Sequence, residues 1–224
     1  MTDREAVAPL AAGPARAAAQ AWFGDRLPRA EAYARLLATD GVVRGLIGPR
    51  ESPRLWDRHL LNCAAAAELI PVGVRVIDVG SGAGLPGLVL ALARPDLTVT
   101  LLEPKLRAAT FLTEAIAALE LDPRITVVRA RAEEYVGRIA PADVVTARAV
   151  APLDRLAEWC LPLVSVRGRL LALKGESAAA EVAAHAAAVR RHGGGQPVIR
   201  QCGGEWLDPP TTVVEIVKER RPKR

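Results

Sequence analysis

The sequence predicts an α/β fold, a seven-stranded and mostly parallel sheet with helices on both faces, and a helical extension ahead of it. A short apolar run at residues 74–79 has the composition of a buried parallel strand. A glycine-rich loop over residues 80–87 follows, and the chain then becomes apolar at helical spacing. Short apolar runs and helical patterns alternate from there to residue 218, which is typical of βαβ units.

The chain divides into three predicted parts: a helical extension at 1–70, a core at 71–218 and a basic tail at 219–224. In the extension we expect helices at 4–21 (interrupted at Gly13-Pro14), 28–39 and 53–70. The predicted strands of the core are 74–79, 98–102, 125–128, 143–146, 169–173, 198–201 and 212–218. The predicted helices of the core are 86–93, 105–120, 133–139, 152–161 and 176–191, with a loop at 162–168.

Composition narrows the possible classes of protein. The 224 residues suffice for one α/β domain with an extension, and a net charge of +5 permits an anionic partner without requiring one. No apolar run reaches 18 residues, and the first residues lack the order of a signal peptide, so we expect a cytoplasmic protein without a membrane span. The three distant cysteines, Cys63, Cys160 and Cys202, form neither a disulfide framework nor a zinc pattern, so we expect buried thiols and no metal.

The glycine loop indicates a nucleotide-type cofactor. Its spacing fits the dinucleotide fingerprint G-x-G-x-x-G, and Glu103 ends the next predicted strand 19 residues after Gly84. Two features disfavour a pyrophosphate: the carboxylate of Asp78 directly before the loop, and Pro86, which removes a backbone N–H from the helix start. A cationic cofactor without phosphate, such as S-adenosylmethionine, suits the loop better. A dinucleotide site and a purely structural glycine turn remain the alternatives.

The string from Asp78 to Gly84 resembles the first motif of class I methyltransferases, which have a Rossmann-like sheet. The resemblance implies that Glu103 holds the ribose hydroxyls of the cofactor. It also implies that the last strand inserts antiparallel to the others.

Several further strings resemble one family more specifically. They are Trp56-Asp-Arg-His59-Leu-Leu, Asp78 through Leu-Pro-Gly87, Arg131-Ala-Glu133, Val145-Thr-Ala-Arg148-Ala-Val-Ala-Pro152 and Leu171-Ala-Leu-Lys174-Gly175. Together they are similar to the RsmG (GidB) family, the bacterial guanine-N7 methyltransferases of small-subunit ribosomal RNA, over about residues 25–218. The chain departs from the pattern at Asn62-Cys63, where many relatives have Asp-Ser, and at residues 45–50.

The resemblance implies cofactor-binding residues, and the charge and position of basic side chains indicate candidates for RNA binding. The expected cofactor-binding residues are Asp78, Gly80, Gly82, Gly84, Leu85, Glu103, Ala132, Glu133 and Arg148. The expected RNA-binding residues are Arg58, His59, Lys105, Arg107 and Lys174. Arg148, just past a strand's C-terminal end, is open to two interpretations: contact with the methionine carboxylate, or a fork to guanine O6 or to phosphate. The implied partner is 16S ribosomal RNA or the small ribosomal subunit, bound by a monomer.

The motifs that are missing agree with this chemistry. No Asn/Asp-Pro-Pro-aromatic string, typical of exocyclic amine methylation, follows residues 143–146, and Cys160 lies inside a predicted helix rather than in a nucleophile loop. N7 of guanine has an in-plane lone pair and no proton, so no general base is expected and orientation dominates. A methyltransferase of a small molecule or protein, and a non-catalytic nucleotide-binding module, are the alternative functions.

Overall fold

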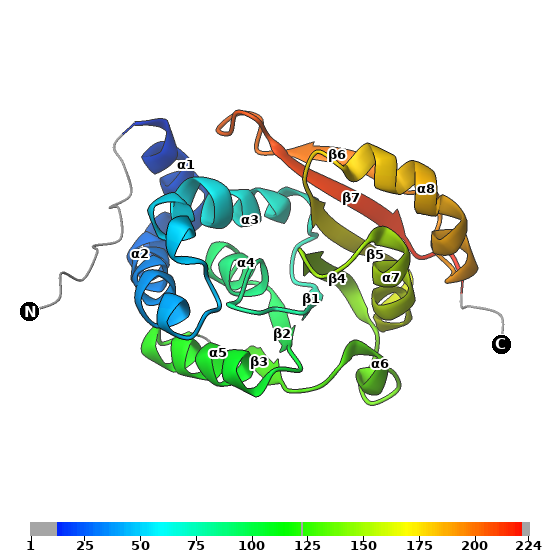
Figure 1. The fold of residues 1–224 in the computed structure, drawn as a ribbon, viewed down its shortest axis with the longest axis horizontal. Helices are drawn as coiled ribbons and strands as arrows, with labels where there is room; N and C mark the ends of the chain where they lie inside the picture. Colours follow the sequence, from blue (N-terminus) through cyan, green and yellow to red (C-terminus); the bar gives the residue numbers. More distant parts are fainter. Residues whose placement is uncertain (1–12, 122, 221–224) are drawn as a thin grey trace, which may run out of the picture.

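The computed structural model describes residues 13–121 and 123–220, and its centre is one seven-stranded sheet in the order β3-β2-β1-β4-β5-β7-β6 (Figure 1). β7 is antiparallel to both neighbours, and every other pairing is parallel. The strands are β1 Arg75–Val79, β2 Thr98–Leu102, β3 Ile125–Val128, β4 Ala142–Arg148, β5 Val164–Lys174, β6 Val198–Cys202 and β7 Thr211–Val217. The predicted fold, including the antiparallel last strand, is confirmed.

Helices cover both faces of this sheet (Figure 1). The α-helices are α1 Pro14–Phe23, α2 Leu27–Leu36, α3 Leu61–Ala65, α4 Gly87–Ala93, α5 Leu106–Ala118, α6 Ala132–Tyr135, α7 Leu153–Cys160 and α8 Ala178–Arg191. Shorter 3₁₀ and π segments are η1 Gly24–Arg26, η2 Leu37–Gly41, η3 Pro49–Arg54, η4 Leu55–Leu60, η5 Ala66–Leu69 and η6 Leu161–Leu163. None of the helices in the described ranges is long and apolar enough to cross a bilayer.

The strands are apolar because both of their faces are buried. On β1, Val76 belongs to the hydrophobic cluster that includes α1 to α5, whereas Ile77 and Val79 belong to the cluster under α7 and α8. Alternate side chains of one strand therefore enter two different cores. This two-sided burial leaves most polar chemistry to the strand ends and the loops, apart from buried polar residues within strands such as Asp78, Thr146 and Glu215.

The helical extension packs onto the same face as α4 and α5. Ala18, Tyr33 and Leu60 of the extension share one buried cluster with Leu88 and Phe111 of the core. The division at residue 70 stays a prediction, since no boundary in packing separates the two parts. All three cysteines are free and buried, as expected.

Three predicted segments are wrong in detail. The predicted loop at 162–168 instead contains the start of β5 at Val164, whose pairing with β4 carries an irregularity; Arg167 there has a positive φ of 71°, which breaks the alternating pattern. The predicted helix at 53–70 is four short segments, η3 to η5 with α3. The predicted helix at 133–139 ends at Tyr135. Residues 4–12 of the first predicted helix and 221–224 of the predicted tail lie outside the described residues.

Candidate functional site

The glycine loop between β1 and α4 combines tight packing with one open position. Gly80, Gly82 and Gly84 have φ of 70°, 56° and 95°. A Cβ on Gly84 would lie 2.7 Å from the Tyr33 hydroxyl, and one on Gly80 would lie 2.8 Å from a methyl of Val150. At Gly82 the nearest atom is a backbone oxygen 3.8 Å away. Gly82 is therefore the loop position that leaves room for a ligand to touch the backbone.

Asp78 is fully buried, and both of its carboxyl oxygens have protein partners. One oxygen accepts the backbone N–H of Gly87 at 3.1 Å, and the other accepts the hydroxyl of Thr146 at 2.8 Å. Burial raises the pKa of this carboxyl to about 6. Direct contact between Asp78 and a cofactor does not fit this geometry. Asp78 instead ties the loop to the start of α4 and to β4.

Glu103, at the end of β2, also supports the glycine loop through hydrogen bonds. Its carboxylate accepts the backbone N–H of Gly82 at 2.9 Å and that of Lys105 at 2.8 Å, and the residue is 5% exposed. A carboxylate has about four acceptor sites, so two remain for ribose hydroxyls. The position beside the open Gly82 is the one that the expected ribose role requires.

Tyr33 supports the loop and was not predicted as a site residue. Its hydroxyl donates to the carbonyl of Ala83 from α2 of the helical extension, and burial raises the pKa of the phenol, which keeps it a donor. No sequence pattern indicates this contact, because a tyrosine on an apolar helix face is ordinarily a core residue.

Arg148 is the last residue of β4. It lies between the glycine loop and the segments η4 and α3 of the helical extension. Its guanidinium donates to the Cys63 sulfur at 3.0 Å, to the Arg58 carbonyl at 3.1 Å and to Nδ1 of His59 at 2.6 Å. Ala149 follows with a positive φ of 54°, and next comes the Val150 side chain that packs on Gly80. The tip of β4 therefore connects the glycine loop to the helical extension.

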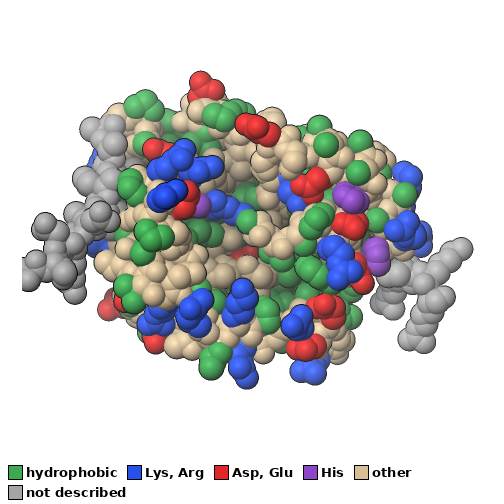
Figure 2. All heavy atoms as spheres, viewed as in Figure 1, with side chains coloured by type: hydrophobic (Ala, Val, Ile, Leu, Met, Phe, Trp, Pro, Cys, Tyr) green, Lys and Arg blue, Asp and Glu red, His purple; other side chains and the backbone are tan. Residues whose placement is uncertain are grey.

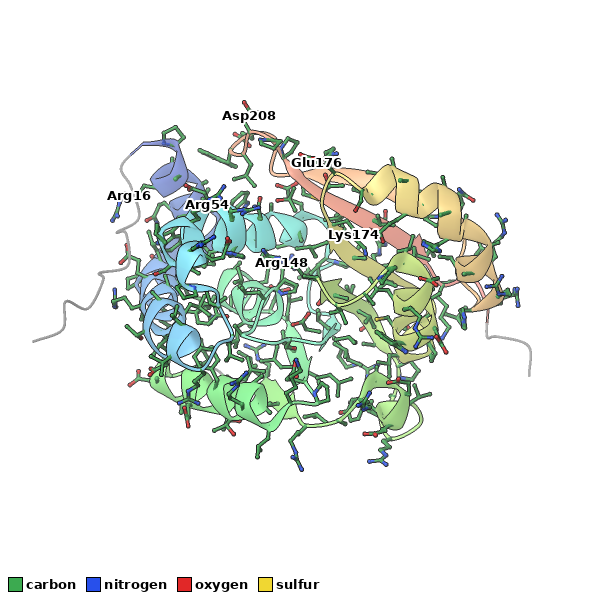
Figure 3. The ribbon with its side chains drawn as sticks, viewed as in Figure 1. Arg16, Arg54, Arg148, Lys174, Glu176 and Asp208 are labelled. Carbon is green, nitrogen blue, oxygen red and sulfur yellow. The ribbon has the colours of Figure 1, made fainter. Side chains whose placement is uncertain are left out.

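Arg148 also lines a pocket of about 1170 Å³. Its walls come from the start of α1, from η3 and η4, from the ends of β4 and β5, and from the segment 206–212 before β7. Its charged lining residues are Glu51, Arg54, Asp57, Arg58, Arg148, Lys174, Glu176 and Asp208, together with His59. Figure 2 shows the hollow on this face, and Figure 3 labels five of its lining residues, Arg54, Arg148, Lys174, Glu176 and Asp208.

The structure brings together some of the predicted RNA-binding residues and separates others. Arg58, His59 and Lys174 line the pocket with Arg148. The Lys174 ammonium is held by the Ala151 carbonyl and by Glu181, each at 2.8 Å, which favours a structural role for it.

The remaining predicted residues lie outside the pocket lining. Lys105 and Arg107 are exposed at the start of α5. At the start of α6, Ala132 is buried and Glu133 is exposed. Leu85 is half-buried in the glycine loop. In Figure 2, Lys and Arg side chains gather at the edge of the molecule over α5 and α6, where they form a basic rim. Within the described ranges no three His, Cys, Asp or Glu side chains form a group that could hold a metal ion.

The sheet order, the antiparallel β7 and the glycine loop after β1 define a class I methyltransferase fold. Solved structures agree. A mitomycin 7-O-methyltransferase superposes with a TM-score of 0.59 at 18% identity, covering 92% of this chain and 69% of that one. An S-adenosylmethionine-dependent O-methyltransferase from Thermotoga maritima gives 0.55 at 15% identity, covering 73% and 66%. At this identity the likeness concerns the fold alone.

Residues 26–207 match the GidB family model, described as rRNA small subunit methyltransferase G. The "Ribosomal RNA small subunit methyltransferase G" of Salinispora tropica is 66% identical over 208 residues, covering 91% of this chain and 86% of that protein. Proteins of the same name from Streptomyces avermitilis and Corynebacterium efficiens are 56% and 53% identical, covering 91% and 95% of this chain and 85% and 90% of their own lengths. The chain belongs to this family, as the motifs predicted.

Proposed function

We propose that this protein transfers the methyl group of S-adenosylmethionine to N7 of a guanosine in 16S ribosomal RNA. Family membership supports the reaction and the substrate. The structural observation that carries the proposal is the junction at the tip of β4, where Val150 packs on Gly80 of the glycine loop and Arg148 lines the pocket. The glycine loop suits a nucleoside cofactor, and the pocket suits RNA.

The loop fits the cofactor through named groups. Glu103 has free acceptor sites beside Gly82, where ribose hydroxyls can donate. When bound there, S-adenosylmethionine supplies an electrophilic methyl group. Ala132 and Glu133, expected to meet the adenosine, lie at the start of α6, just after β3, the strand next to β2. Their role stays a proposal, as do those of Leu85, Gly80 and Gly84.

The pocket needs no general base for this reaction. N7 presents its lone pair at neutral pH, so the residues around it have to orient the base and exclude water, which can contribute about 7–11 kcal/mol. Arg54, Arg58 and Arg148 line the pocket with guanidinium groups suited to phosphate or to guanine O6. The carboxylates of Glu176 and Asp208, which also line the pocket, suit the positive charge that N7 methylation places on the purine.

The partner that follows is 16S ribosomal RNA, alone or within the small subunit, met in the cytoplasm by a monomer. Backbone binding by arginines makes affinity depend on salt. The basic rim over α5 and α6, to which Lys105 and Arg107 belong by position, would extend this electrostatic surface.

Mass-spectrometric mapping of methylated guanosines tests the proposal. Ribosomal RNA from cells with and without the protein is digested, and the purified protein is then incubated with the unmethylated RNA and S-adenosylmethionine. We expect one 7-methylguanosine to disappear and to be restored. Unchanged rRNA with turnover on a small molecule or a protein would favour the first alternative. Cofactor binding without turnover on any of these substrates would favour a non-catalytic module.

A further inference from the structure

Three side chains, Glu51, His59 and Arg148, form a hydrogen-bonded chain from the rim of the pocket to the tip of β4. Glu51 in η3 faces His59 in η4, with Oε2 of the carboxylate 2.8 Å from Nε2 of the ring. The other ring nitrogen, Nδ1, lies 2.6 Å from Nη2 of Arg148. The three residues come from three separate segments and meet at the wall of the same pocket.

The hydrogen-bond roles in this chain are fixed by chemistry. Arg148 can only donate, so Nδ1 of His59 must accept and carry no proton. The single N–H of the neutral ring is then on Nε2, which donates to the carboxylate of Glu51. Burial lowers the pKa of His59, and the nearby Arg148 lowers it further, so the ring is neutral at physiological pH.

The carboxylate of Glu51 is suited to accept the hydrogen bond from His59. The hydrogen bond from His59 lowers the pKa of Glu51, so the carboxylate is ionised and acts only as an acceptor. Its second oxygen lies 3.5 Å from Nη1 of Arg58, whose carbonyl accepts from Arg148. Glu51 therefore reaches Arg148 both through the ring of His59 and through the backbone of η4.

We propose that Glu51 is a positioning residue, which selects the Nδ1-accepting tautomer of His59 and thereby aims the Arg148 guanidinium at the RNA substrate. The inference rests on the proposed function, because Arg148 matters only if this pocket receives the substrate. It goes beyond that function by giving a role to Glu51, which does not itself touch the base. His59 acts through Arg148 in the same way.

The contacts from Glu51 through His59 to Arg148 also have a structural role, which must be distinguished from the functional role. Glu51 also joins η3 to η4, so its removal could loosen the extension without changing the aim of Arg148. Two outcomes separate the roles. A positioning residue acts only when Arg148 is present, whereas a fastening residue changes stability and activity whichever side chain stands at position 148.

A double-mutant cycle provides the test. Single-turnover methylation of unmethylated 16S rRNA is measured for Glu51→Ala in wild-type, Arg148→Ala and Arg148→Lys backgrounds. We expect a loss of about tenfold in the wild-type background, the effect of one hydrogen bond to a charged group, and less than about twofold in the other two. Equal losses in all three backgrounds would overturn the inference.

Conservative variants sharpen the result. Glu51→Gln keeps an oxygen that accepts from Nε2, and His59→Asn places an amide oxygen where Nδ1 accepts from Arg148. Both should retain activity within about threefold of wild type, a change smaller than the loss of a hydrogen bond, whereas His59→Leu should resemble Glu51→Ala. If Gln and Asn are as damaging as Ala and Leu, the hydrogen-bond chain is not what matters.

A matched control removes a carboxylate from a different ion pair, which joins the extension to α5. Glu114→Ala breaks the contact between Glu114 in α5 and Arg44, away from the pocket, and should leave the rate unchanged. If the wild-type protein methylates no ribosomal RNA, the proposed function fails. If it methylates RNA and Glu51→Ala is as active as Glu114→Ala, only the positioning role fails.

Discussion

The glycine loop and the pocket, two halves of one candidate site, are built in different ways. The loop and the two carboxyls that support it come from residues 78–103, and these carboxyls accept from three backbone N–H groups and from the Thr146 hydroxyl. The pocket draws its charged side chains from η3, η4, the ends of β4 and β5, and the segment before β7. Local sequence therefore supplies most of the loop, to which distant segments add Tyr33, Thr146 and Val150, whereas the pocket exists only when distant segments fold together.

The two halves also differ in exposure. Asp78 and Glu103 are buried at the loop, whereas the cations that line the pocket are in contact with solvent, with the Arg58 side chain 51% exposed. Changes at the loop should alter cofactor affinity or folding independently of salt. Changes at the pocket should alter RNA methylation in a salt-dependent way and leave cofactor binding largely intact.

The largest effect is expected from Gly82→Val. A branched side chain fills the open side of the loop and strains a backbone with φ of 56°, so affinity for S-adenosylmethionine should fall below detection by calorimetry. Gly73→Val is the matched control, since Gly73 has φ of 70° and open space around it, but lies before β1. Both should lose about 1–2 kcal/mol of stability, and only Gly82→Val should lose the cofactor. Equal affinity in the two variants would remove the loop from the cofactor site.

Arg148→Ala should come next. Removing a guanidinium at the junction should reduce methylation of ribosomal RNA by about a hundredfold, the upper range for hydrogen bonds to charged groups, and the melting temperature should change little. Arg155→Ala, which removes an exposed arginine of α7 that pairs with Glu158, is the control and should leave the rate unchanged. Full activity of Arg148→Ala would show that Arg148 has only a structural role, joining the helical extension to β4.

Glu103→Ala should weaken cofactor binding about tenfold, since it removes the proposed ribose acceptor and frees the N–H of Gly82. Calorimetric titration with S-adenosylmethionine measures this effect. The affinity for RNA at fixed salt should stay the same. A variant that binds the cofactor like the wild type would show that the ribose is held elsewhere.

The smallest effect on binding is expected from Asp78→Asn, because this carboxyl faces inward. Its pKa, about 6 in the fold, lies above the unfolded value of about 3.9. The stability that it contributes is therefore fully present below about pH 4 and is lost as the pH rises through 6. Asp78→Asn should remove this part of the pH dependence in urea titrations and leave cofactor affinity within about threefold, less than one hydrogen bond. A large loss of affinity would restore Asp78 to the list of direct contacts.

The difference between the two halves also explains what the sequence could predict. The strand bounds 98–102 and 125–128 match the structure, as does the glycine loop, because these depend on local apolar runs and turn chemistry. The contact of Tyr33 with Ala83 joins residues 50 apart, and that of His59 with Arg148 joins residues 89 apart. Local patterns carry no trace of such pairs, so Glu51 and Tyr33 were missed. The inward turn of Asp78 was missed for the same reason, because its partner Thr146 lies 68 residues away.

The most direct test of the central claim, that the loop holds the cofactor and the pocket holds the RNA base, is a crystal structure with S-adenosylhomocysteine and a guanosine nucleotide. We expect the ribose of the cofactor product on Glu103 beside Gly82, and the guanine in the pocket with N7 facing the sulfur and Arg148 within hydrogen-bonding distance of the nucleotide. Adenosylhomocysteine bound only between α1 and the segment 206–212, with the glycine loop empty, would contradict the account.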